Sequence, residues 1–235
     1  MYRNLVNNMK SLSPRQPKAL LGAKKVALIA VMTATLEASK LALAWAANIE
    51  IVTLLCGVYG YVFGPIGVLA IGLFVVIESL IWGFNTWILS YIIYWPMVCL
   101  VFWLLGKFKV KNIFLLTLSA ILLTVWFGVL TSLIDVGLFM GFYQNFWKRF
   151  CIYYIRGLPF YAVHVACNLC SFLLLFKPMA NTLQNLKIKF LGESRTKLLA
   201  QDNSHSNDTV LSTNILRISD MQSNDTKNNQ TTTKQ

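Results

Sequence analysis

The sequence predicts an all-α, polytopic membrane protein: a compact bundle of six transmembrane helices with both termini in the cytoplasm. The 235 residues are 56% hydrophobic and only 13% charged, which is more apolar than soluble domains at about 45–50%. Few acidic residues precede residue 190, and these are Glu37, Glu50, Glu78 and Asp135. Long apolar runs, separated by glycine-proline turns or basic loops, are typical of membrane-spanning helices.

The placement of the basic residues supports this topology. They gather before the first apolar run, in one short loop and after the last run: Arg3, Lys10, Arg15, Lys18, Lys24 and Lys25; Lys107, Lys109 and Lys111; Lys177, Lys187 and Lys189. Such clustering follows the positive-inside rule and places all three groups in the cytoplasm. Lys148 and Arg149, in an expected outer loop, are the exception. No basic stripe alternates with exposed aromatic residues, so the net charge of +12 does not indicate a nucleic-acid partner.

The chain divides into three segments. Residues 1–23 are predicted to be a polar cytoplasmic segment, 24–180 the membrane domain and 181–235 a polar cytoplasmic tail. From residue 193 the tail is rich in Asn, Ser, Thr, Gln and Asp and has no aromatic residue, a composition typical of disorder.

The first three helices are expected over 26–47, 49–64 and 67–83. The first run is too long for a signal peptide and is interrupted by Glu37 and Lys40, so it is expected to be retained. The second and third are short for a hydrocarbon core that takes roughly 20 residues. We therefore expect these two helices to be buried in the bundle or strongly bent.

The last three helices are expected over 87–105, 113–137 and 150–176. The fourth follows an outer turn at 83–86, and Pro96 is expected to kink it. The sixth is expected to bend near Pro159 and to end at Lys177, just before Pro178.

Charged residues in the outer halves of four helices predict one polar cavity open to the outside. These residues are Glu50, Glu78, Asp135 and Arg156. The alternative is internal pairing, of Asp135 with Arg156 or of a glutamate with Lys40, for which Glu37 competes. For Glu78 a water-lined or ligand-lined pocket is favoured over a closed ion pair, because a buried carboxylate is costly unless it is paired or hydrated.

Aromatic residues of the fourth helix give this cavity a wall. Trp87, Tyr91, Tyr94 and Trp95 share one helix face, and aromatic walls with a few polar groups are usual for small-molecule pockets. An interfacial belt is the alternative, and it suits Trp82 and Trp87 best.

The sixth helix contributes a polar stripe that includes Arg156, His164 and Asn168. His164 is either a packing residue or a ligand contact. The five cysteines lie in or beside apolar runs, and the CxxC of Cys167 and Cys170 is interpreted as packing, so no metal site is expected.

Three stretches carry a resemblance to a known family. They are Asn48–Leu55 with Tyr61–Gly64; Ile77–Phe84 with Trp87 and Tyr91–Pro96; and Gly157–Phe160 with His164 and Asn168. Over about residues 24–180 the chain resembles the substrate-binding (S) components of bacterial energy-coupling factor transporters. The longer, more polar tail departs from the family.

The resemblance implies a plasma-membrane protein that captures a vitamin or related micronutrient, without cofactor or catalysis of its own. A membrane coupling subunit and two cytoplasmic ATPases would complete the transporter, and this sequence accordingly has no GxxxxGK[ST] loop. The alanine stripe would pack on the coupling subunit: Ala30, Ala34 and Ala38. The expected ligand is a flat, neutral or cationic heterocycle. Its expected contacts are Glu50, Glu78, Trp82, Asn85, Trp87, Tyr91, Trp95, Arg156, His164 and Asn168.

Two other functions stay open. A self-contained, proton-coupled carrier would use Glu78 as its relay, although no inverted repeat is evident. An intramembrane hydrolase would use the HxxxN of His164 and Asn168. That reading is weakened because the only other histidine, His205, lies in the tail and no Glu-Glu pair occurs.

Overall fold

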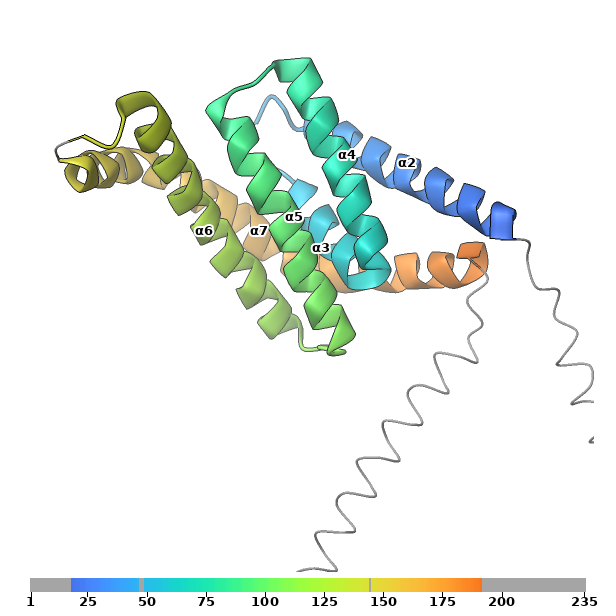
Figure 1. Ribbon diagram of the computed structural model, residues 1–235. Helices are drawn as coiled ribbons and strands as arrows, with labels where there is room; N and C mark the ends of the chain where they lie inside the picture. Colours follow the sequence, from blue (N-terminus) through green and yellow to red (C-terminus); the bar gives the residue numbers. More distant parts are fainter. Residues whose placement is uncertain (1–17, 47–48, 144, 192–235) are drawn as a thin grey trace, which may run out of the picture. The chain divides into compact units, whose positions relative to one another are not determined.

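The computed structural model describes residues 18–46, 49–143 and 145–191 (Figure 1). The predicted polar lead-in up to residue 17 and the tail from residue 192 lie outside the described residues. The described part belongs to the first of two units into which the chain divides, Met1–Leu191. Within it there are six α-helices and no strand, which confirms the all-α class.

The helices follow one another with short connections. Their bounds are α2 Lys18–Ala42, α3 Val52–Phe63, α4 Pro65–Trp82, α5 Thr86–Lys107, α6 Ile113–Met140 and α7 Phe146–Leu191. Each corresponds to one predicted helix, and α5 continues through Pro96. A single residue, Gly64, separates α3 from α4, and its φ of 60° is the left-handed conformation that favours glycine.

The predicted end of the last helix is wrong. Pro178 lies inside α7, which continues to Leu191. A proline removes one backbone hydrogen bond and ends a helix only if nothing else holds the following turns. Here Lys24 of α2 lies over the Phe190 ring, 5.8 Å from its centroid, and the Lys187 Nζ donates a hydrogen bond to the Val62 carbonyl at 3.1 Å.

Helix α3 is the centre of the bundle. Every residue of α3 except Tyr61 is buried, and α3 packs against α5, α7, α4 and α2. A helix that is apolar on all sides is stable only inside a larger structure. Its 12 residues extend about 18 Å, less than a hydrocarbon core of about 30 Å. The expected burial of this short helix is thus observed.

Glycine allows α3 and α5 to approach closely. A Cβ atom on Gly60 would overlap the backbone carbonyl of Cys99 on α5, and one on Gly106 would lie 2.6 Å from the Tyr61 carbonyl oxygen. The two backbones are therefore in direct contact. This contact fixes where the aromatic face of α5 stands relative to α3.

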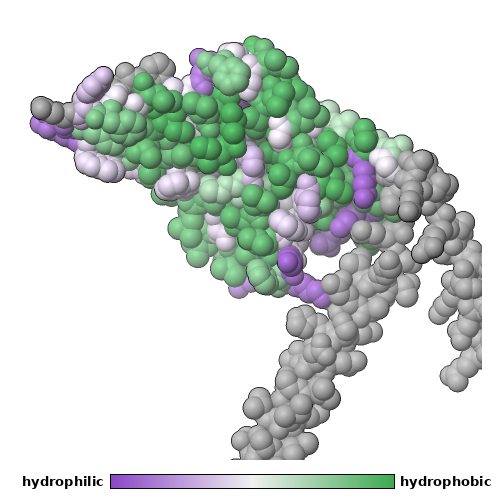
Figure 2. Space-filling view, viewed as in Figure 1, coloured by the Kyte–Doolittle hydropathy of each residue, from purple (hydrophilic) through white to green (hydrophobic). Residues whose placement is uncertain are grey.

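Four helices are long and apolar enough to cross a membrane: α4, α5, α6 and α7. Large apolar side chains are exposed on them, among them Leu80, Leu122 and Leu174. Figure 2 shows a predominantly hydrophobic face over these helices. Extended apolar surfaces of this kind are rare on soluble monomers, so the structure is that of a multi-pass membrane protein. Helix α2 is not one of these four, and α3 is apolar but shorter than they are. Four of the six predicted spans are therefore supported by length and composition.

Candidate functional site

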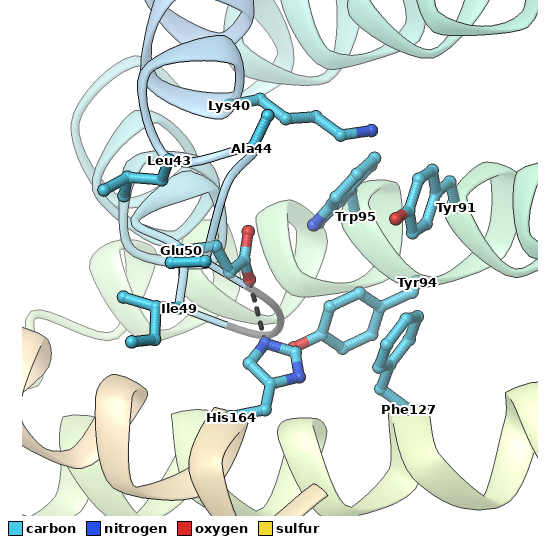
Figure 3. Close-up of a pocket in the computed structure, with 11 residues that line it drawn as sticks. Lys40, Leu43, Ala44, Ile49, Glu50, Tyr91, Tyr94, Trp95, Phe127 and His164 are labelled. Atoms are coloured by element: carbon cyan, nitrogen blue, oxygen red, sulfur yellow. Dashed lines mark hydrogen bonds and ion pairs between the residues drawn. The ribbon is translucent and has the colours of Figure 1, made fainter. Parts of the chain in front are cut away.

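A cavity of about 220 Å³ lies where the α2–α3 connection meets α5, α6 and α7. We call it the Glu50 cavity (Figure 3). Aromatic rings, one carboxylate, one histidine and one lysine line it: Lys40, Leu43, Ala44, Ala46, Ile49, Glu50, Tyr91, Tyr94, Trp95, Phe127 and His164. Four of the predicted ligand contacts thus meet at one place: Glu50, Tyr91, Trp95 and His164.

Glu50 and His164 form the polar centre of the cavity. The His164 Nε2 lies 2.9 Å from the Glu50 Oε1, and the Thr53 hydroxyl donates to the same oxygen. The Cys167 thiol donates to the Glu50 backbone carbonyl at 3.3 Å. These contacts hold Glu50 at the N-terminal side of α3 and orient its carboxylate, while its other oxygen is left to face the cavity.

A buried network of hydrogen-bonding side chains lies next to Glu50 and His164, deeper in the bundle. The Tyr94 hydroxyl lies 3.4 Å from the Thr53 hydroxyl and 3.5 Å from that of Thr124. The Asn168 amide donates to Thr124 at 2.9 Å. Asn168 is fully buried and belongs to this supporting layer, one turn below His164. Hydrogen-bonded layers of this kind keep the residues above them in one orientation.

Trp95 presents a donor to the cavity. Its side chain is buried, and the indole N–H has no hydrogen-bond partner among the described residues. Figure 3 shows this nitrogen on the side of the ring that faces Glu50. A buried polar group without a partner is costly and needs an explanation such as water or a ligand. The cavity therefore offers a donor and an acceptor on opposite walls.

Lys40 closes the rim of the cavity. Its ammonium pairs with the Glu78 carboxylate and lies over three rings of α5, at 4.5 Å from the centroid of Tyr91, 5.2 Å from Trp87 and 5.4 Å from Trp95. Cation–π contacts within about 6 Å of a centroid are favourable, more so where water is excluded. Carboxylate and aromatic rings together fix this ammonium between α2, α4 and α5.

Glu78 does not line the expected water-filled or ligand-binding pocket but is paired with Lys40. Its side chain is fully buried, and one of its oxygens has no hydrogen-bond partner. It does not line the Glu50 cavity, whereas its partner Lys40 does. Of the two alternatives that the sequence leaves open, the ion pair with Lys40 is formed.

The remaining predicted residues are spread around this centre. Trp82 and Trp87 line a neighbouring cavity of about 250 Å³, which Lys40 also lines. Asn85 is exposed at the turn before α5, where its amide donates to the Trp82 carbonyl at 3.0 Å. Their role in ligand binding stays a prediction.

Asp135 and Arg156 do not form the ion pair that was the alternative to a cavity. The Asp135 carboxylate accepts a hydrogen bond from the Tyr153 hydroxyl at 2.9 Å. Arg156 is exposed and lines a different cavity from Glu50. The expected single cavity is thus divided into separate compartments.

Seven residues that line the Glu50 cavity are missing from the expected contacts: Lys40, Leu43, Ala44, Ala46, Ile49, Tyr94 and Phe127. Phe127 and Ile49 carry no chemical signal that distinguishes them from other apolar residues. Lys40 does, because a lysine inside an apolar run requires a partner. Within the described ranges, no group of three or more His, Cys, Asp or Glu side chains could hold a metal ion.

Comparisons with protein-family models, with curated proteins and with solved structures found no match to this chain. Fold and site together define its class: a helical multi-pass membrane protein with an aromatic cavity of mixed polarity. The resemblance to S components stays a prediction, and it enters below as a proposal.

Proposed function

We propose that the chain is the substrate-capture subunit, or S component, of an energy-coupling factor transporter in a bacterial plasma membrane. It would bind a vitamin or related micronutrient with high affinity and would not itself be an enzyme. Partner ATPases would hydrolyse ATP, and six membrane helices would leave both termini in the cytoplasm. The Glu50 cavity carries the proposal, because it combines aromatic walls with a few placed polar groups, the usual composition of a ligand pocket.

The chemistry of the cavity favours a small, flat heterocycle. The rings of Tyr91 and Trp95, with centroids 3.9 Å apart, offer faces for stacking. Trp95 has an unused donor, and Glu50 has a free acceptor on the opposite wall. A ring with an acceptor on one edge and a donor on the other would satisfy both. A neutral or cationic ring fits best beside the Glu50 carboxylate.

The exposed face of α2 suits a membrane partner. Ala30, Ala34 and Ala38 are all exposed, whereas Met32 and Leu36 are buried, on a helix that packs against α4. The alanines thus do not pack inside the bundle, the alternative that the sequence leaves open. Small residues at every fourth position permit close approach of another helix. In the proposed transporter this face would contact the coupling subunit.

Thermal stabilisation tests the proposal directly. The purified full-length chain in dodecyl maltoside is heated with each of a panel of vitamins and their precursors. A ligand at a hundredfold excess over its dissociation constant should stabilise the folded state by about 2.7 kcal/mol, a shift of about 5–10 °C for a chain of this size. Glu50→Gln should weaken the shift, and Asp135→Asn, outside the cavity, should not. A shift unchanged in Glu50→Gln would place the ligand elsewhere.

A second candidate is a self-contained proton-coupled carrier. The buried Glu78 with one unpartnered oxygen favours it, because buried ionisable groups in membranes often serve as proton relays. Proteoliposomes that contain this chain alone decide between the two. Uptake driven by a pH gradient would support the carrier, and uptake only with the coupling subunit, ATPases and ATP would support the proposed S component.

A further inference from the structure

A second cavity, of about 510 Å³, lies between α5, α6 and α7, and we call it the Arg156 cavity. Its lining is Trp87, Tyr91, Phe127, Thr131, Tyr153, Arg156, Gly157, Phe160 and Tyr161. It shares Tyr91 and Phe127 with the Glu50 cavity. The rings of these two residues are stacked, with centroids 6.2 Å apart and planes inclined by 19°, so a partition of two side chains separates the cavities.

Arg156 is the only charged residue of this lining. No hydrogen bond or ion pair joins it to another described residue, and the nearby polar groups are otherwise engaged. The Tyr153 hydroxyl donates to Asp135 at 2.9 Å, and the Tyr161 hydroxyl lies 2.8 Å from the Ser132 hydroxyl. The guanidinium thus faces an aromatic cavity with its donors unused.

The position of Arg156 on an apolar helix favours the binding of an anion. Arg156 lies on a helix apolar enough to cross a membrane, beside exposed Ile155 and Phe160. Charges in such surroundings are rare and usually paired. The planar guanidinium presents its donors as a fork that matches the oxygens of a carboxylate or phosphate. Aromatic rings around it favour a ligand whose anionic group is attached to a ring.

We propose that the Arg156 cavity binds the phosphate or carboxylate group of the same small molecule whose ring occupies the Glu50 cavity. This inference rests on the proposed function and narrows its substrate class. The ring itself is neutral or cationic beside Glu50, and an anionic substituent reaches past Tyr91 and Phe127 to Arg156. A vitamin phosphate or a ring carboxylic acid has this composition.

Protection from phenylglyoxal, which modifies arginine guanidinium groups, tests the anion site without knowledge of the ligand. The full-length chain in dodecyl maltoside is modified with and without inorganic pyrophosphate, titrated through the millimolar range. Modification of each arginine is followed by peptide mass spectrometry. At tenfold excess over its dissociation constant, pyrophosphate should slow modification of Arg156 about tenfold by occupancy. Arg149, which already donates to the carbonyls of Gly141 and Tyr143, should be unaffected and is the internal reference.

Two matched variants and a comparison of pyrophosphate with an anionic lipid complete the test. Pyrophosphate should also raise the apparent Tm of the wild-type chain, because it binds the folded state. Arg156→Gln should abolish this rise in Tm. Lys148→Gln, which removes an exposed charge outside the cavity, should leave it unchanged. Protection by pyrophosphate supports the proposal. Protection only by phosphatidylglycerol in mixed micelles would overturn it and identify the anion as a lipid headgroup. Absence of protection by either would also overturn it.

The two proposals fail separately. A vitamin shift that depends on Glu50, without protection of Arg156, would refute only the anion compartment. Once a vitamin is identified, its phosphorylated and unphosphorylated forms, or its acid and amide, are compared. The anionic form should bind more tightly by about tenfold or more, because hydrogen bonds to a charged group contribute more than neutral ones. Arg156→Gln should remove that preference, and a preference that survives the substitution would contradict the proposal.

Discussion

Replacement of Lys40 should destabilise the protein more than any other single change at the site. Lys40→Met removes the partner of Glu78, which is fully buried, and the contacts with three aromatic rings. Breaking a buried pair by removing one partner typically costs about 3–5 kcal/mol. For a chain of this length that corresponds to an apparent Tm lower by about 6–20 °C.

The reverse change should cost less. In Glu78→Gln the lysine keeps its aromatic contacts, and its side chain is 21% exposed, so water can solvate it. We expect a loss of about 1–3 kcal/mol. The double variant Lys40→Met/Glu78→Gln should be more stable than Lys40→Met by itself, because no buried charge is left without a partner.

Chemical rescue of Lys40→Ala tests the same ion pair. Lys40→Ala leaves a space bounded by a carboxylate and aromatic rings, the arrangement that binds alkylammonium ions. Methylammonium should raise the apparent Tm of Lys40→Ala, measured by tryptophan fluorescence in dodecyl maltoside. It should not raise that of the wild type or of Lys40→Ala/Glu78→Gln. Equal destabilisation of Lys40→Met and the double variant, together with no rescue, would refute the buried pair.

Three further predictions concern packing, the polar centre and topology. Gly60→Ala places a methyl group against the backbone of α5 and should cost about 1–3 kcal/mol. Gly72→Ala, where nothing lies within 4 Å, should be neutral or stabilising, and similar Tm losses in both would contradict the close approach. His164→Phe removes the partner of the cavity carboxylate and should weaken ligand binding about tenfold or more; unchanged affinity would make His164 a packing residue. Single cysteines at Asn145 and Lys109 should react with membrane-impermeant maleimide from opposite sides, and labelling from one side would overturn the topology.

The sequence by itself determined the helical class and the order of the helices. Apolar runs and glycine-proline punctuation are local signals, so the turn at Gly64 and the short buried α3 were predictable. The end of α7 was not, because Pro178 favours a helix end locally, while contacts with α2 and the bond from Lys187 to Val62 hold the helix beyond it.

Only the tertiary structure decided which polar groups meet. Glu50 and His164 are 114 residues apart, and the sequence named both as expected ligand contacts without pairing them. Lys40 had Glu37 and Glu78 as possible partners, and the packing of α2 on α4 selected Glu78. Arg156 was separated from Glu50 by the rings of Tyr91 and Phe127. The physical reason is common to all three: hydrophobic period sets which face of a helix is buried, whereas partner choice depends on the rotation and offset between helices.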